Sequence, residues 1–189
     1  MDLDALIDAV RNHYLSRYRE AIRDYRARFQ PGGPEVLLEF GRDEDYVYRL
    51  YRFDLASGAV NPPNFTEVNP ATHLEFDPAA FNVGGIMVDV SPFVWNGVEF
   101  VVSPPIKDAA VLQAWALRWI DPEETAIPDE FGLGAYVHSI TAPEARRDCT
   151  SFSVDFGSAP LSCFYGLLDV LSTLGVKSVS IHSCTALGR

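Results

Sequence analysis

The chain has 189 residues, the usual size of one domain, and 48% of them are hydrophobic, so it can bury a core and is not disordered. Its formal net charge of -11 argues against a nucleic-acid partner, because binding phosphates requires clustered Lys and Arg. No apolar run has the length of a membrane span, the N-terminus carries no signal-like pattern, and the three cysteines are widely spaced. We therefore expect a cytoplasmic protein without a cofactor or a membrane partner.

Residues 1–30 have the pattern of one long helix. Apolar side chains recur there at steps of three and four residues, namely Leu3, Ile7, Val10, Tyr14, Tyr18, Ile22, Tyr25 and Phe29. A helix of about 28 residues is about 42 Å long, which is more than a domain of this size needs. The stripe either packs across its own domain or pairs with a second copy, so a homodimer through this helix is one expectation.

Residues 35–95 form a β-rich segment, in which short apolar runs alternate with turns. The strongest hairpin signal is Asn96–Gly97, which lies between the predicted strands 86–90 and 98–102. This dipeptide predicts that the two strands pair directly with each other.

From residue 98 to 183 the predicted order is strand, helix, strand, strand, helix, strand. This β-α-β-β-α-β order is typical of ferredoxin-like folds. The sequence therefore predicts a single α+β domain over residues 1–189, with an antiparallel or mixed sheet and two helices on one face. The Asn96–Gly97 hairpin would give strand 98–102 a third neighbour, so either the hairpin is not tight or the strand order differs.

The sheet face turned away from the helices is the first candidate site. Alternation along the last strands places small hydroxyls, two acids and a histidine on this face, namely Glu99, Ser151, Ser153, Asp155, Ser180 and His182. One interpretation is a shallow polar pocket in which Asp155 or Glu99 orients His182 as a base. The alternative is a plain solvated face, because alternation alone produces this pattern in an antiparallel sheet.

No motif in the chain identifies a catalytic or metal site. The sequence contains no GxGxxG, P-loop, GxSxG or HExxH motif. The segment His73–Asp77 lacks a second cluster that could complete a metal site, and His138 fits an ordinary strand histidine. We therefore predict no metal ion and no catalytic residue, and whether the chain is an enzyme stays open.

Acidic residues gather in the segment 121–130, and they are Asp121, Glu123, Glu124, Asp129 and Glu130. A surface of this kind fits a basic protein partner, which it would attract electrostatically. In size and charge alone, the chain resembles small acidic bacterial proteins that neutralise a basic partner, such as toxin-immunity proteins. The sequence thus favours a non-catalytic interaction protein; the alternative is a small-molecule-binding protein or enzyme that uses the polar open face.

Overall fold

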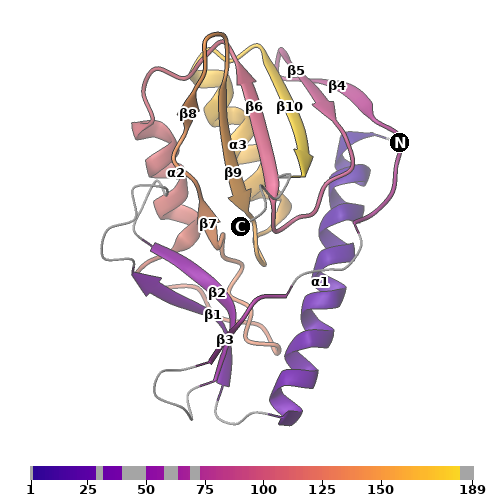
Figure 1. The fold of residues 1–189 in the computed structure, drawn as a ribbon, viewed down its shortest axis with the longest axis vertical. Helices are drawn as coiled ribbons and strands as arrows, with labels where there is room; N and C mark the ends of the chain where they lie inside the picture. Colours follow the sequence, from indigo (N-terminus) through magenta and orange to yellow (C-terminus); the bar gives the residue numbers. More distant parts are fainter. Residues whose placement is uncertain (1, 29–31, 40–49, 58–63, 69–72, 184–189) are drawn as a thin grey trace.

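The computed structural model describes residues 2–28, 32–39, 50–57, 64–68 and 73–183 (Figure 1). The described part contains both helices and sheets, so the α+β prediction is confirmed. The helices are α1 (Leu3–Arg28), α2 (Ala110–Ile120) and α3 (Leu161–Thr173). The strands are β1 (Gly32–Glu39), β2 (Leu50–Ser57), β3 (Asn64–Thr66), β4 (Ala79–Val83), β5 (Ile86–Val90), β6 (Val98–Ser103), β7 (Ser139–Ile140), β8 (Glu144–Ala145), β9 (Thr150–Asp155) and β10 (Ser178–Ser183).

The larger sheet has the strand order β4-β5-β10-β6-β9-β7, and β8 pairs with the edge of β9. Within it, β10, β6, β9 and β7 are antiparallel neighbours, while β5 and β10 are parallel. Both α2 and α3 lie behind this sheet in Figure 1, as predicted. The strands β5 and β4 extend the sheet beyond β10, so the whole sheet is larger than the predicted ferredoxin-like unit.

The prediction of a hairpin at Asn96–Gly97 is wrong, because β10 lies between β5 and β6. Gly97 donates a hydrogen bond to the carbonyl of Val94, so the dipeptide does form a turn. That turn belongs to a connection that passes β10 and buries Trp95 completely. β6 therefore has only the neighbours β10 and β9, which removes the conflict in strand order.

The strand predicted directly after the first helix of the 98–183 unit is reduced to the two residues of β7. Ahead of β7, backbone N–H groups donate to groups outside any strand ladder: Gly134 to a Glu35 carboxylate oxygen, Tyr136 to Ser158 Oγ and Val137 to the Trp119 carbonyl. Ala135 also has a positive φ of 64°, which a regular strand does not allow. This irregular segment lies beside the candidate site described below.

The smaller sheet has the order β1-β2-β3 and is antiparallel throughout. Figure 1 shows α1 running beside both sheets, which explains its length. Its apolar stripe is buried in the chain's own core, from Leu3 to Tyr25. Tyr14, Tyr18 and Tyr25 are therefore not available to a second copy, and a homodimer through α1 would have to use another face. Within the described residues, no helix combines the length and apolarity needed to cross a membrane.

Candidate functional site

The candidate site lies where the two sheets meet, at a point held by the main chain of His138. The His138 N–H donates to the carbonyl of Asp155 at the end of β9, and its carbonyl accepts from the N–H of Arg52 in β2. Both distances are 2.9 Å. This connection brings His138 between Asp155 and Asp54, which lies two residues after Arg52 on the same strand.

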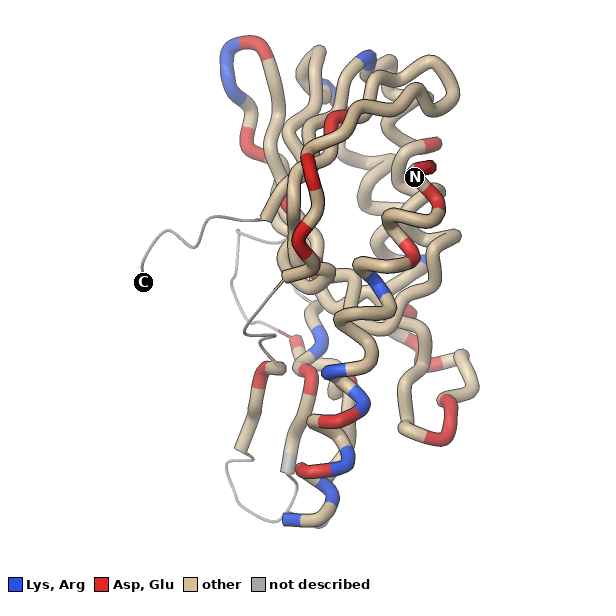
Figure 2. The backbone as a smooth tube through the Cα atoms, turned by 90° about the vertical axis from the view of Figure 1, so that its right-hand side faces the viewer, with Lys and Arg blue, Asp and Glu red and all other residues tan. Residues whose placement is uncertain are grey.

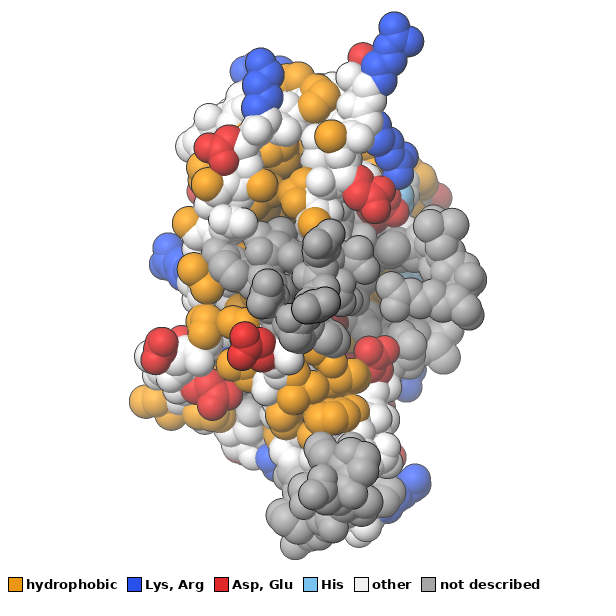
Figure 3. All heavy atoms as spheres, turned by 60° about the vertical axis from the view of Figure 1, so that its left-hand side comes forward, with side chains coloured by type: hydrophobic (Ala, Val, Ile, Leu, Met, Phe, Trp, Pro, Cys, Tyr) orange, Lys and Arg blue, Asp and Glu red, His pale blue; other side chains and the backbone are white. Residues whose placement is uncertain are grey.

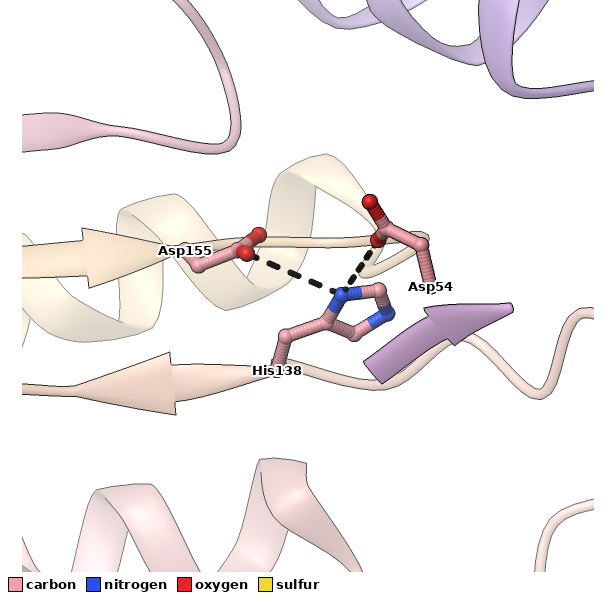
Figure 4. Close-up of side chains that lie close together, drawn as sticks. All are labelled: Asp54, His138 and Asp155. Carbon is pink, nitrogen blue, oxygen red and sulfur yellow. Dashed lines mark ion pairs between the residues drawn. The ribbon is translucent and has the colours of Figure 1, made fainter. Parts of the chain in front are cut away.

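The two aspartates approach one ring nitrogen of His138 from different sides (Figure 4). Nδ1 of His138 lies 3.0 Å from Asp54 Oδ1 and 3.7 Å from Asp155 Oδ2. On the other side of the ring, Nε2 lies 3.0 Å from Glu35 Oε1. The side chains of His138 and Glu35 are each 1% exposed, so three carboxylates surround a buried imidazole.

Each aspartate is oriented by a main-chain N–H group. Asp54 Oδ2 accepts from Val68 N–H at 2.6 Å, and Asp155 Oδ1 accepts from Gly157 N–H at 2.9 Å. In both residues the other oxygen is therefore left to face His138 Nδ1. Such fixed orientation of carboxylates is typical of ligand-binding sites, where the binding atoms are held in place before a ligand arrives.

A local distortion of the smaller sheet directs Glu35 and Asp54 toward His138. In the β1–β2 register, Pro34 pairs with Leu55 and Val36 with Phe53, but Glu35 and Asp54 between them are not a ladder pair. Glu35 has a φ of 54°, an uncommon and strained conformation for a residue other than glycine. Strain of this kind gathers at functional sites, where the surrounding structure maintains it.

Two tyrosines of α1 close the site from the side opposite α2. Tyr18 Oη donates to the main-chain carbonyl of Asp54 at 2.7 Å, and Tyr14 Oη lies 3.4 Å from Asp54 Oδ1. Burial raises the pKa of both phenols well above the usual value, and Asp54 adds to the rise. The tyrosines therefore remain protonated donors that stabilise the Asp54 peptide and carboxylate.

The side chain of Arg52 stabilises the strained backbone at Glu35. Its buried guanidinium donates to the carbonyls of Glu35, Ile120 and Asp121, and to the Glu124 carboxylate. The guanidinium also stacks on the Tyr136 ring, 3.8 Å from its centroid. These contacts join β1 to the C-terminal end of α2, whose free carbonyls attract a positive charge. They also occupy the donors of Arg52, so it is mainly a structural residue.

Burial and the neighbouring carboxylates together shift the pKa values of His138 and Asp155. Burial alone would lower the pKa of His138, but Asp155, Asp54 and Glu35 outweigh it and raise the pKa well above the usual value. Burial raises the pKa of Asp155 to about 7, while His138 opposes the rise and Asp54 adds to it. The Asp155 side chain is 25% exposed toward the pocket, so water moderates this burial effect. The cluster thus holds a proton at neutral pH that a cation could replace.

A pocket of about 260 Å³ opens beside the two aspartates. Its wall includes the acids Asp54, Glu67 and Asp155, along with Asn96 and Ser153. Asn96 Oδ1 and His138 Nδ1 are buried, and neither makes a hydrogen bond within the described part of the chain. Asp54 Oδ1 forms an ion pair with Nδ1 at 3.0 Å, but the two groups are not aligned for a regular hydrogen bond. Buried polar atoms are nearly always paired, so a ligand in the pocket could supply the hydrogen bonds that these two atoms lack within the described residues.

The residues predicted on the open face do not come together in one site. Glu99 pairs in register with Ser153 on β9 and with His182 on β10, and Glu99 Oε2 lies 3.8 Å from His182 Nδ1. Asp155 lies instead beside His138, so it does not orient His182. Ser153 and Asp155 line the pocket, whereas Ser151 is buried. Ser180 is half-buried on β10 and does not line this pocket.

Several acids of the segment 121–130 have internal contacts. Asp121 accepts from Thr125 and Ala126, and Asp129 accepts from the N–H groups of Phe131 and Leu133. Glu124 binds Arg52, as described above. Glu123 and Glu130 have exposed side chains. Figure 2 shows that the acidic residues are spread over the fold, and in Figure 3 acidic and hydrophobic side chains gather together at the lower left.

Sequence reasoning missed Glu35, Asp54 and the role of His138. One signal was present, because Arg52 and Asp54 alternate with Tyr51, Phe53 and Leu55 in β2. Charged residues at alternate positions of an otherwise apolar strand share one face, and a buried face of this kind requires partners. Comparisons of the chain with protein-family models, curated proteins and solved structures found no significant match.

Proposed function

We propose that the chain binds a small positively charged ligand in the pocket between its two sheets. The observation that carries this proposal is His138 Nδ1, a buried nitrogen without a hydrogen bond in the described structure, which faces the carboxylates of Asp54 and Asp155. This proposal corresponds to the small-molecule-binding alternative of the sequence analysis, but it places the ligand beside His138 rather than beside His182.

The charge of the pocket supports a cation over an anion. Among the described residues that line it, three are acids and one, Arg52, is cationic. The donors of Arg52 are occupied by the chain's own carbonyls and by Glu124. An anion would therefore meet uncompensated carboxylates. A cation would gain their attraction, which is stronger in a partly buried site than in water.

The same geometry supports binding rather than acid–base catalysis. A general base needs a nitrogen that can reach a substrate. His138 is 1% exposed, and both of its ring nitrogens face carboxylates of the chain itself. We therefore propose no reaction for this site.

Thermal unfolding with a panel of metal ions and small organic amines tests the proposal. A ligand that binds only the folded state raises its stability, by about 2.7 kcal/mol at 100 times the Kd. We expect at least one cation to raise the Tm of the unaltered chain and to lose this effect in Asp155→Asn. The matched control is Asp89→Asn, which removes an exposed carboxylate from the same sheet. A panel with no effect, or a rise with anions alone, would contradict the proposal.

A second proposal is the basic protein partner of the acidic segment 121–130. The exposed side chains of Glu123, Glu124, Asp129 and Glu130 support it. Because Asp121, Glu124 and Asp129 also make contacts within the chain, the informative variant is Glu123→Gln with Glu130→Gln. If a basic protein co-purifies with the chain, the double variant should weaken its binding at low salt. Unchanged binding would exclude this segment as the docking surface.

A further inference from the structure

From the geometry around His138 we infer that the ligand is a divalent transition-metal ion, bound directly by Asp54 Oδ1, His138 Nδ1 and Asp155 Oδ2. This inference rests on the proposed function and names the ligand of the same pocket. It departs from the sequence-based expectation of no metal site, which rested on the absence of metal-binding motifs, on the lack of a second cluster near His73–Asp77 and on the interpretation of His138 as an ordinary strand histidine.

The spacing of the three atoms fits one ion. Ligand atoms that lie about 2.1 Å from a metal are about 3.0 to 3.4 Å apart at octahedral to tetrahedral angles. His138 Nδ1 and Asp54 Oδ1 are 3.0 Å apart, and Nδ1 and Asp155 Oδ2 are 3.7 Å apart. All three atoms lie within 4.8 Å of one another. The distance from Nδ1 to Asp155 Oδ2 exceeds the upper end of this range by about 0.3 Å, and the partly exposed Asp155 side chain can move closer.

Glu35 orients the His138 imidazole for metal binding. A histidine that binds a metal through one nitrogen commonly donates its other N–H to a carboxylate, which fixes the tautomer and the ring orientation. Glu35 Oε1 is 3.0 Å from Nε2, and its second oxygen is held by the N–H of Gly134 at 2.6 Å. In the neutral ring, with its proton at Nε2, the lone pair of Nδ1 points toward two carboxylates, and a proton or a metal ion can lie between them. Glu35 is thus a positioning residue.

The mixed donor set selects the class of ion. Mg²⁺ and Ca²⁺ prefer oxygen ligands alone, whereas an imidazole nitrogen suits ions such as Zn²⁺, and carboxylates also suit Mn²⁺. Three protein ligands leave at least one position for water on the pocket side. Asn96 Oδ1, which lines this pocket and makes no hydrogen bond within the described residues, is an acceptor suited to such a water.

Calorimetric titration of the chelator-treated protein tests the inference. The titrants are Zn²⁺, Mn²⁺, Mg²⁺ and Ca²⁺, with putrescine as an organic amine. We expect one equivalent of Zn²⁺ or Mn²⁺ per chain and much weaker binding of Mg²⁺ and Ca²⁺. Asp155→Asn should lower the affinity at least about 100-fold, because even outer-shell partners are worth about 10- to 100-fold.

The control variants separate this site from other histidines. Asp89→Asn, His73→Ala and His182→Asn should leave the affinity unchanged, since Asp89 lies on the exposed face and the two histidines pair with Glu75 and Glu99 elsewhere. Substitution of His138 carries a risk of misfolding because the residue is buried. Asp54→Asn therefore serves as the second test variant, with circular dichroism as the check of folding.

The possible outcomes distinguish the metal-ion inference from the proposed cation pocket. Zn²⁺ binding that is lost in Asp155→Asn and Asp54→Asn supports both the metal ion and the pocket. Stabilisation by putrescine alone overturns the metal inference but leaves the proposed cation pocket standing. Zn²⁺ binding that is lost only in His73→Ala or His182→Asn, or no binding of any cation, overturns the metal site.

Discussion

Glu35 and His138 are 103 positions apart in the sequence, yet Oε1 of Glu35 lies 3.0 Å from Nε2 of His138 and both side chains are buried. The pair joins the smaller sheet to the segment that leads into β7. It also determines which ring nitrogen carries the proton, so Nδ1 is left to face Asp54 and Asp155. The candidate site therefore depends on a residue that does not itself touch the pocket.

At a pH above the raised pKa of His138, where the ring is neutral, Glu35→Gln should move its single proton from Nε2 to Nδ1. Glu35 accepts hydrogen bonds at both oxygens, from His138 and from Gly134, and a Gln amide can accept only one of them. Its NH₂ group must then donate to Nε2, so the ring proton takes the other nitrogen. The ¹⁵N chemical shifts of the imidazole report the tautomer directly. The control is Glu39→Gln, an exposed site on the same strand, and an unchanged tautomer in Glu35→Gln would contradict the assigned role.

Gly157→Ala should disrupt the site by contact with His138. A Cβ at Gly157 would lie 2.2 Å from Cδ2 of His138, and φ there is +47°. We expect a loss of about 2 to 4 kcal/mol from the clash and the backbone strain together, measured by urea unfolding. Gly175→Ala separates the two causes, because φ is +80° there but no atom lies within 4 Å of the added Cβ. Equal losses in both variants would show that contact with His138 contributes nothing.

Tyr18→Phe should cost more stability than Tyr14→Phe. Tyr18 Oη donates at 2.7 Å to the carbonyl of Asp54, whereas Tyr14 Oη makes only a long contact of 3.4 Å with the carboxylate. Removing the first leaves a buried acceptor, which costs about 1 to 3 kcal/mol. The two phenols share one helix and the same degree of burial, so each serves as the control for the other. The expectation fails if Tyr14→Phe shows the larger loss.

Arg52→Lys should destabilise the fold although it keeps the positive charge. An ammonium group cannot reproduce the planar set of bonds to the carbonyls of Glu35, Ile120 and Asp121. We expect a loss of about 3 kcal/mol, because hydrogen bonds to charged groups contribute about 1.5 to 3 kcal/mol each. Chemical denaturation measures it, with the exposed Arg118→Lys as control. A loss as small as that of the control would contradict the role given to Arg52.

Without added cations, the stability of the chain should fall as the pH rises from about 4 to above 7. Asp155 has its pKa raised to about 7 in the folded state, so the fold binds a proton that the unfolded chain releases from about pH 4 upward. His138 also has a raised pKa, and the stability it adds is present at low pH and is lost as the pH rises through that value. Glu35, Asp54, Tyr14 and Tyr18 face these two groups.

Asp155→Asn should remove the part of this decline that ends near pH 7. The expected difference is about 1 to 2 kcal/mol at pH 8, since one pKa unit corresponds to about 1.4 kcal/mol and water in the pocket screens part of the effect. Thermal and urea unfolding at pH 5 and pH 8 in a chelating buffer measure it. A stability that increases with pH in the unaltered chain would show that the sign is wrong.

Local patterns were sufficient to predict the helices. The helix predicted over residues 1–30 agrees with α1 to within a few residues at each end, and the two helices predicted between residues 98 and 183 correspond to α2 and α3. Helical periodicity and the breaks at proline and glycine depend on neighbouring residues, so one chain segment contains the whole signal. Alternation likewise placed Ser153 and Asp155 on one sheet face, and the structure shows both at the pocket.

The strand order could not be predicted from a turn signal alone. Asn96–Gly97 does form a turn, but the predicted hairpin is absent because β10, from the far end of the chain, lies between β5 and β6. All strands of the chain compete for pairing partners, so one favourable dipeptide does not determine which two strands pair. The same holds for residues 134–138, where a Glu35 side chain and the end of α2 accept hydrogen bonds in place of a neighbouring strand.

The sequence by itself thus determined the helices and the placement of Ser153 and Asp155 on one face of the sheet. Only the tertiary structure decided that Asp155 faces His138 rather than His182, and that Glu35 and Asp54 join them. The physical reason is that the four residues come from four segments of the chain, which meet only where the smaller sheet packs against the larger one. A buried histidine acquires its chemistry from the carboxylates around it, and their identity is a property of that packing.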